Sequence, residues 1–180
     1  IDITYEGVIG RYDTHILTLG VLQGMLAGRV DGEVNFVNVA GIAEERGISV
    51  REVKEPAAVD FLNVITVSAR DAGGDLSVAG TTLGPAHRPR FVGIYGHDID
   101  IEPVENMVFL RAAAQVPGSL GKIGTKLGEF GVNVSQVTVA APRPGEPGVM
   151  GLAVSRRHSG DELAAVVAAA GLLDAKRVTL

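Results

Sequence analysis

The chain of 180 residues contains no cysteine and no tryptophan, and aromatic residues make up only 4% of it. The absence of cysteine excludes disulfide bonds, thiolate nucleophiles and zinc sites that use cysteine ligands. It also agrees with a reducing compartment, and we predict a cytoplasmic protein. With so few aromatic residues, the core is expected to consist of Val, Leu, Ile and Ala.

Long apolar runs and excess positive charge are missing too. The longest apolar stretch, residues 163–173, is too short to span a bilayer, and the N-terminus shows no signal peptide. The net charge of −5 and the pI of about 5.3 argue against nucleic acid or an anionic membrane as the main partner. Because the sequence opens in a strand-like run without Met, we expect a fragment or a processed product.

The first part of the chain, residues 1–103, mixes strand and helix patterns. Asp13 or Thr14 is the expected cap of a first helix that ends at Gly28. A second helix is expected over residues 39–47, closed by its C-terminal glycine. Apolar and polar alternation predicts strands over residues 1–10, 34–37, 48–53, 61–69, 76–83, 91–95 and 99–101.

The second part, residues 104–180, is more regular. The expected order is strand, helix, two strands, helix and strand, over residues 107–114, 119–130, 132–141, 148–155, 159–170 and a last strand around Val178. This is the split βαβ pattern of ferredoxin-like domains. The fold class is therefore α+β with two domains, 1–103 and 104–180. Two helices would cover one sheet face and leave the other face, or an edge, to another copy.

A glycine-rich corner is the most informative feature of the second part. Pro117-Gly118 ends a strand, a helix follows, and Gly131-Val132-Asn133 leads into the next strand. The corner offers backbone N–H groups, a helix N-terminus and a side-chain amide, which suit a small polar ligand or a twin subunit. It offers no nucleophile and no general base. We therefore expect a sensor rather than a catalyst.

Gly121, Gly124 and Gly128 lie on one side of that helix. Each costs about 1 kcal/mol of helix propensity relative to Ala. For Gly124 and Gly128 we expect close packing of helix and neighbour as the reason. For Gly118 and Gly121, close to the positive end of the helix, ligand approach and close packing stay open.

The residues of both parts resemble known modules. Pro117-Gly118, Leu120-Gly121, Ile123 and residues 131–133 resemble an ACT domain, an amino-acid-sensing βαββαβ module. Residues 14–22, 24–26, 34–38, 43–48 and 80–81 resemble the intervening domain of the long-form D-3-phosphoglycerate dehydrogenases. The resemblance covers essentially the whole chain, with both domains in the family's order.

The resemblance implies a parent enzyme that oxidises 3-phosphoglycerate with NAD, the first step of L-serine biosynthesis. It also implies feedback by L-serine, dimers formed through paired ACT domains, and a homotetramer in the parent. The chain has no G-x-G-x-x-G after a strand, the usual pyrophosphate cradle. NAD is thus expected in a catalytic part outside it, with no cofactor, metal or catalysis in this chain.

The effector site implied by the resemblance lies between paired ACT domains, at Gln115, Pro117, Gly118 and Asn133. The Asn133 amide has donors and an acceptor for the two charged groups of an amino acid. Its alternative role is a turn residue in the left-handed conformation. Gln115 and Ala113 depart from the family pattern, and Ala113 cannot donate a hydrogen bond. Serine sensitivity is therefore open.

An anion or substrate site is implied at His87, Arg88, Arg90 and Arg156. Guanidinium groups bind phosphate and carboxylate with forked hydrogen bonds, and the family has a basic residue at the position of Arg90. Glu102 stands at another basic position and would repel an anion, so Arg156 is expected to supply the lost charge. The alternative is a solvated surface loop.

Two other functions remain as alternatives. The chain could be the regulatory domain pair of another amino-acid enzyme such as L-serine dehydratase, or a purely structural module with non-functional pockets. His97, Asp98 and Asp100 also have a spacing that a metal site could use, although a hairpin turn explains them better.

Overall fold

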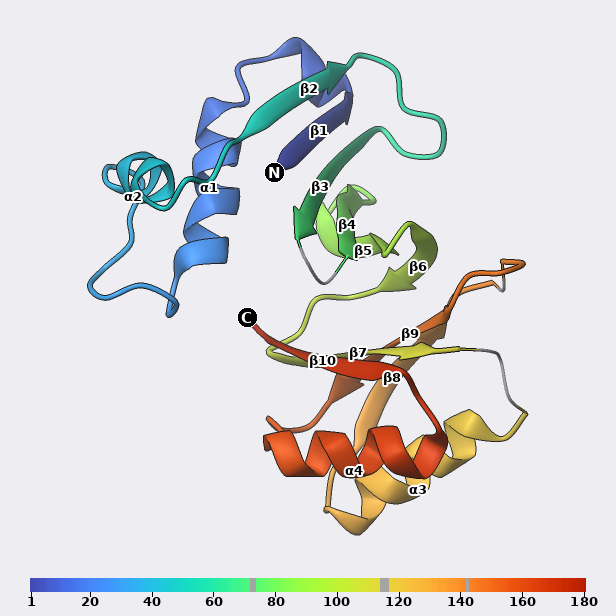
Figure 1. Cartoon of the computed structure of the whole chain (residues 1–180). Helices are drawn as coiled ribbons and strands as arrows, with labels where there is room; N and C mark the ends of the chain where they lie inside the picture. Colours follow the sequence, from blue (N-terminus) through green and yellow to red (C-terminus); the bar gives the residue numbers. More distant parts are fainter. Residues whose placement is uncertain (72–73, 114–116, 142) are drawn as a thin grey trace. The chain divides into compact units, whose positions relative to one another are not determined.

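The computed structural model describes residues 1–71, 74–113, 117–141 and 143–180, which divide into two compact units, 1–82 and 83–180 (Figure 1). The predicted domain boundary at residues 103 and 104 falls inside the second unit. As a division between two family domains it stays a prediction. No helix in the described ranges has both the length and the apolar character that a bilayer crossing requires.

The first unit is built on strand β1 (Asp2–Gly7). Strand β2 (Arg51–Glu55) pairs with it in parallel on one side, and strand β3 (Asn63–Asp71) pairs antiparallel on the other. Strand β4 (Gly74–Leu83) follows β3. The alternation in β1 places Ile3 and Tyr5 in the interior, fully buried. The strands predicted over 61–69 and 76–83 are confirmed.

Strand β1 is shorter than predicted because of Gly7. This residue has φ +90°, and a Cβ atom there would lie 2.1 Å from the carbonyl oxygen of Leu62. Only glycine permits this close approach. The chain leaves the strand at this point and forms a short 3₁₀ helix (Val8–Arg11). The predicted strand over residues 1–10 is therefore wrong in its last three residues.

Two helices accompany this sheet, α1 (His15–Leu26) and α2 (Val39–Glu45). They pack together through Leu22, Leu26, Val39 and Ala43. Both helices were predicted. The predicted strand over residues 48–53 is displaced, because β2 starts only at Arg51.

The predicted strand over residues 34–37 is wrong. The segment is a loop in which two side-chain amides replace the partners of a strand. The Oδ1 atom of Asn35 accepts bonds from the backbone N–H groups of Val37 and Asn38 at 2.9 and 3.1 Å, and Oδ1 of Asn38 accepts from the Asn35 N–H at 2.8 Å. Asn side chains commonly compete with regular structure in this way.

The second unit contains strand β7 (Asn106–Ala112), helix α3 (Ser119–Glu129), strands β8 (Val134–Val139) and β9 (Gly148–Val154), helix α4 (Gly160–Ala170) and strand β10 (Asp174–Thr179). The sheet order is β10-β7-β9-β8, and all its pairs are antiparallel. The predicted α+β class and the βαββαβ order are confirmed. Both helices cover one face of this sheet over an apolar core (Figure 1).

The other face of that sheet carries a hairpin of strands β5 (Arg88–Ile94) and β6 (His97–Ile101). The ring of Phe91 meets that of Phe109 edge-on, 6.1 Å between centroids, and the Arg111 guanidinium lies 4.6 Å from the centre of the Tyr95 ring. Strands β7 and β9 are consequently buried on both faces. The expectation that this face is free for another copy is wrong, and the alternative, an edge, remains.

Candidate functional site

The glycine-rich corner begins α3 as the sequence indicates. Gly118 has the left-handed conformation, with φ +85°, and its carbonyl oxygen accepts a bond from the Lys122 N–H at 3.1 Å. A Cβ atom at Gly118 would meet nothing within 4 Å. The position therefore requires glycine for its backbone conformation and not for space. No side chain caps this helix, so its first N–H groups are available to a ligand.

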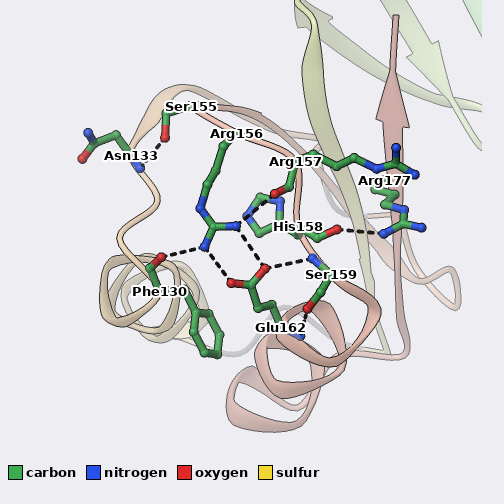
Figure 2. Close-up of polar contacts among 9 residues, drawn as sticks. All are labelled: Phe130, Asn133, Ser155, Arg156, Arg157, His158, Ser159, Glu162 and Arg177. Carbon is green, nitrogen blue, oxygen red and sulfur yellow. Dashed lines mark hydrogen bonds and ion pairs between the residues drawn. The ribbon is translucent and has the colours of Figure 1, made fainter.

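At the other end of α3, Gly131 turns the chain with φ +68°. The backbone of Asn133 is then fixed by Ser155, whose hydroxyl accepts from the Asn133 N–H at 3.0 Å and whose N–H donates to the Asn133 carbonyl at 2.9 Å. The Asn133 side chain is exposed and points away from the neighbouring arginine cluster (Figure 2). The left-handed role belongs to Gly131, so that alternative for Asn133 is wrong.

The three glycines of α3 leave an open helix face. A Cβ atom at Gly121, Gly124 or Gly128 would meet nothing within 4 Å. Close packing within the chain, which we expected for Gly124 and Gly128, is therefore wrong. Leu120 is also 44% exposed. This face of the helix has room for a close neighbour.

Strand β8 is an edge of its sheet. It pairs with β9 on one side, and among the described residues no strand pairs with its other side. Val137 and Val139 are 44% and 49% exposed, although their partners Leu152 and Met150 are core residues. Because α4 packs against β10 and beside α3, helix α3 lies toward the β8 side of the sheet.

The remaining predicted effector residues add little polar surface. Pro117 is exposed, and Ala113 is exposed and presents only a methyl group. Gln115 lies outside the described residues. The assignment of Gln115, Pro117, Gly118 and Asn133 to an effector site stays a prediction.

Arg90, predicted to bind an anion, is paired within its own hairpin. Its Nε atom lies 2.6 Å from Oδ1 of Asp100, and Nη1 lies 3.7 Å from Oε2 of Glu102. Arg88 is exposed at the start of β5, and His87 is in the preceding turn with φ +49°. Two carboxylates thus already surround the guanidinium that was expected to bind a phosphate.

Arg156 belongs to a different cluster, between α3 and α4 (Figure 2). Its Nη2 atom donates to Oε1 of Glu162 at 2.6 Å and to the Phe130 carbonyl at 2.7 Å, and Nη1 donates to the Arg157 carbonyl at 3.0 Å. The Arg156 guanidinium and the Ser159 N–H lower the pKa of Glu162 to about 2. In the described part of the chain, no hydrogen bond or ion pair joins Arg156 to the Arg90 cluster.

Two histidines are buried in this unit. His97 packs under the hairpin with Nε2 3.3 Å from Oε2 of Glu146, as expected of a hairpin residue. His158 is 2% exposed, and burial lowers its pKa, so it is neutral at neutral pH. Within the described ranges no three His, Asp or Glu side chains are placed to hold a metal ion.

Sequence reasoning missed a buried polar network in the first unit. The hydroxyls of Tyr5 and Thr18 lie 2.8 Å apart, and the Thr18 hydroxyl donates to Oε1 of Glu52 at 2.5 Å while Thr14 donates to Oε2 at 2.9 Å. These bonds lower the pKa of Glu52, and burial raises that of Tyr5. Thr14 and Thr18 are four residues apart on α1, which was the available signal. The network ties α1 to β1 and β2.

A cleft of about 360 Å³ also lies in the first unit, between α1, α2 and the segment leading to β2. Apolar side chains form most of its lining, among them Leu19, Leu22, Ala43, Ile48 and Val50. Its few polar groups include Thr18, already bound to Glu52. The cleft contains no group placed for chemistry.

Comparison with known proteins identifies the family. The model of the D-3-phosphoglycerate dehydrogenase intervening domain matches residues 1–95. The chain is 32% identical over 161 residues to D-3-phosphoglycerate dehydrogenase of Bacillus subtilis, covering 89% of this chain and 30% of that protein. For the enzyme so named from Mycobacterium leprae the identity is 31% over 165 residues, 91% of this chain and 31% of the relative.

A more distant relative, D-3-phosphoglycerate dehydrogenase of Archaeoglobus fulgidus, is 24% identical over 182 residues, with 100% of this chain and 34% of the relative covered. The chain thus spans about a third of the length of the curated relatives it matches. The resemblance noted in the sequence is confirmed at the level of the family. This chain belongs to the D-3-phosphoglycerate dehydrogenase family, through the intervening domain of that family.

Proposed function

We propose that this chain is a regulatory and oligomerising region of a longer D-3-phosphoglycerate dehydrogenase. The catalytic part of that polypeptide would oxidise 3-phosphoglycerate with NAD, the first step of L-serine biosynthesis. The support is the family match, together with relatives about three times the length of this chain. In the longer protein we expect a homotetramer in the cytoplasm.

The module β7–β10 would pair with the same module of a second copy. An edge strand offers unpaired N–H and C=O groups to another strand. On β8 this edge is accompanied by Val137 and Val139, and α3 contributes its open glycine face. Two such edges meeting about a two-fold axis would bury both patches in one isologous contact. This makes the module an ACT-like pairing and sensing domain.

The observation that carries the sensing proposal is the separation of the two ligand groups. Gly118 precedes α3 and Asn133 follows it, so an 11-residue helix lies between them, roughly 16 Å long at 1.5 Å per residue. One chain therefore cannot place both groups on one amino acid. A two-fold pair can, because it sets the start of α3 in one copy against Asn133 of the other.

L-Serine fits such a composite site. Its carboxylate would accept bonds from the uncapped N–H groups at the start of α3, and its ammonium group would donate to the Asn133 carbonyl oxygen of the second copy. Ala113 offers no hydrogen bond, so we expect weak binding.

Calorimetric titration of the chain with L-serine tests this proposal. Asn133→Ala should weaken binding roughly tenfold or more, since an unmade hydrogen bond to a charged group costs about 1.5–3 kcal/mol. Asn106→Ala, an amide on β7, serves as the control and should leave affinity unchanged. A flat titration of the unaltered chain would remove the sensing role.

A second candidate is a module that pairs without sensing, which the exposed methyl group of Ala113 favours. It predicts self-association with no heat from L-serine. The serine dehydratase alternative is disfavoured by the intervening-domain match. Anion binding at His87, Arg88, Arg90 and Arg156 stays a prediction, and internal carboxylates compete with it at Arg90 and at Arg156.

A further inference from the structure

The β5–β6 hairpin is bound to the edge strand β8 through two backbone donors. The N–H of Asp100 donates to Oγ1 of Thr138 at 3.4 Å, and the N–H of Glu102 donates to Oε1 of Gln136 at 3.3 Å. Side chains alternate along a strand. Gln136 and Thr138 therefore face the hairpin, whereas Val137 and Val139 lie on the opposite face of β8.

Thr138 has little freedom to move away from the hairpin. A Cβ atom at Gly151 would lie 3.0 Å from Cγ2 of Thr138 and 3.1 Å from the ring of Phe109. The absence of a side chain at Gly151 lets both groups close over β9. The Thr138 hydroxyl is held where it meets Asp100, so a shift of β8 would be transmitted to this contact.

Asp100 extends the connection to β5. Its N–H is bound by Thr138, and its carboxylate is bound by Nε of Arg90 at 2.6 Å. Only one residue therefore separates the edge strand from the arginine expected to bind an anion. The second β8 contact, through Gln136, ends at Glu102, whose carboxylate is 3.7 Å from the same arginine.

We propose that the β5–β6 hairpin is a coupling element that responds to what binds along the β8 edge, with Thr138 and Gln136 as its positioning residues. What binds there rests on the proposed function above. A second copy paired with β8 restricts this strand, and the restriction reaches Arg90 through Asp100 and Glu102. Ordering of one element lowers the cost of ordering its neighbour, which couples two sites without a large movement.

Amide hydrogen exchange, measured by NMR on the whole chain at low concentration, tests the connection. Thr138→Val removes the acceptor at nearly constant volume, and Thr138→Ser keeps it. Gln136→Leu and Gln136→Glu form the second matched pair. Exchange at Asp100 in the Val variant, and at Glu102 in the Leu variant, should become roughly tenfold faster or more, since a lost hydrogen bond exposes the amide to local opening.

The Ser and Glu variants should keep exchange near that of the unaltered chain. Amides of β1 and β3 should be unchanged in all four variants, which separates a local effect from general loss of stability. Unchanged exchange at both Asp100 and Glu102 in the Val and Leu variants would overturn the coupling element. If Thr138→Val fails to fold, the Gln136 pair decides.

The second arm repeats the measurement as the concentration of the unaltered chain is raised. Self-association should slow exchange at Asp100 and Glu102, and the Thr138→Val and Gln136→Leu changes together should abolish the slowing. Self-association that leaves both amides unaffected overturns the proposal. A chain that stays monomeric counts against the proposed pairing instead, and the variant comparison then decides the coupling alone.

Discussion

The two units are held together in different ways. In the first, α1 is attached to the sheet by hydrogen bonds from Tyr5 through Thr18 to Glu52, with Tyr5 fully buried. In the module β7–β10, the core beneath α3 and α4 is a single apolar cluster, and its polar contacts lie at the rim. A buried polar network demands specific partners, whereas an apolar core demands volume and shape.

The same contrast is visible on the surfaces. The first unit exposes Val37 and Val59 almost completely, at 94% and 98%. In the second unit the exposed valines of β8 are half-buried and follow one strand. Scattered exposed apolar residues carry no specific implication, but a pair along an unpaired edge strand indicates where another strand fits.

The largest effect should come from the apolar core. Leu152 is 1% exposed at the centre of the module, and Leu152→Ala should lower the free energy of unfolding by about 3 kcal/mol through lost burial and the remaining cavity. Denaturant unfolding measures this, with Val137→Ala as a half-exposed control. A loss comparable to that of the control would show that the module does not depend on its core.

A smaller effect is expected from the polar network of the first unit. Thr18→Val leaves the Tyr5 hydroxyl without its partner and removes a donor from Glu52, which should cost about 1–3 kcal/mol. Thr18→Ser keeps the hydroxyl and should recover most of the loss. Equal losses in both variants, measured by thermal unfolding, would mean that Thr18 acts by packing and that the contrast between the units is overstated.

The cap of α4 should contribute less. The Ser159 hydroxyl accepts from the Glu162 N–H at 3.1 Å, and the Glu162 carboxylate accepts from the Ser159 N–H at 2.8 Å. Ser159→Ala should destabilise the module by about 1 kcal/mol, and Ser159→Asp, which restores an acceptor, should be close to neutral. Thermal unfolding of the three chains provides the comparison.

The smallest effect concerns pH. The pKa of Glu162 is about 2 in the folded chain against an ordinary value of 4.5. A lowered folded pKa stabilises the protein above the ordinary value, and this contribution is lost as pH falls from about 4.5 through 2. Glu162→Gln should flatten the dependence of the melting temperature on pH in that window. An NMR titration that places the Glu162 carboxyl near 4.5 would contradict the Arg156 contact.

The sequence predicted the second unit better than the first, for physical reasons. The core of β7–β10 follows from apolar periodicity and from glycines at helix ends, such as Gly131, which are local signals. The loop at Asn35 and Asn38 depends on reciprocal side-chain bonds that no periodicity reveals. Glu52 finds Thr18 only once β2 pairs in parallel with β1.

The candidate site was predictable in part. Gly118 and Asn133 were found because their residue types serve the backbone and the ligand at a helix boundary. The pairing of Arg90 with Asp100 was not, since it depends on the register of the β5–β6 hairpin. The hairpin's place on the sheet, which removed one of the two docking alternatives, is likewise a tertiary feature.

The central claim is that two copies meet along β8 to complete a site for one amino acid, and sedimentation velocity over a concentration series tests it most directly. The account predicts a reversible dimer that L-serine shifts to lower protein concentration. Val137→Lys, which places a charge at the unpaired edge, should leave a folded monomer. A chain that remains monomeric throughout, or a dimer indifferent to Val137→Lys, would contradict the account.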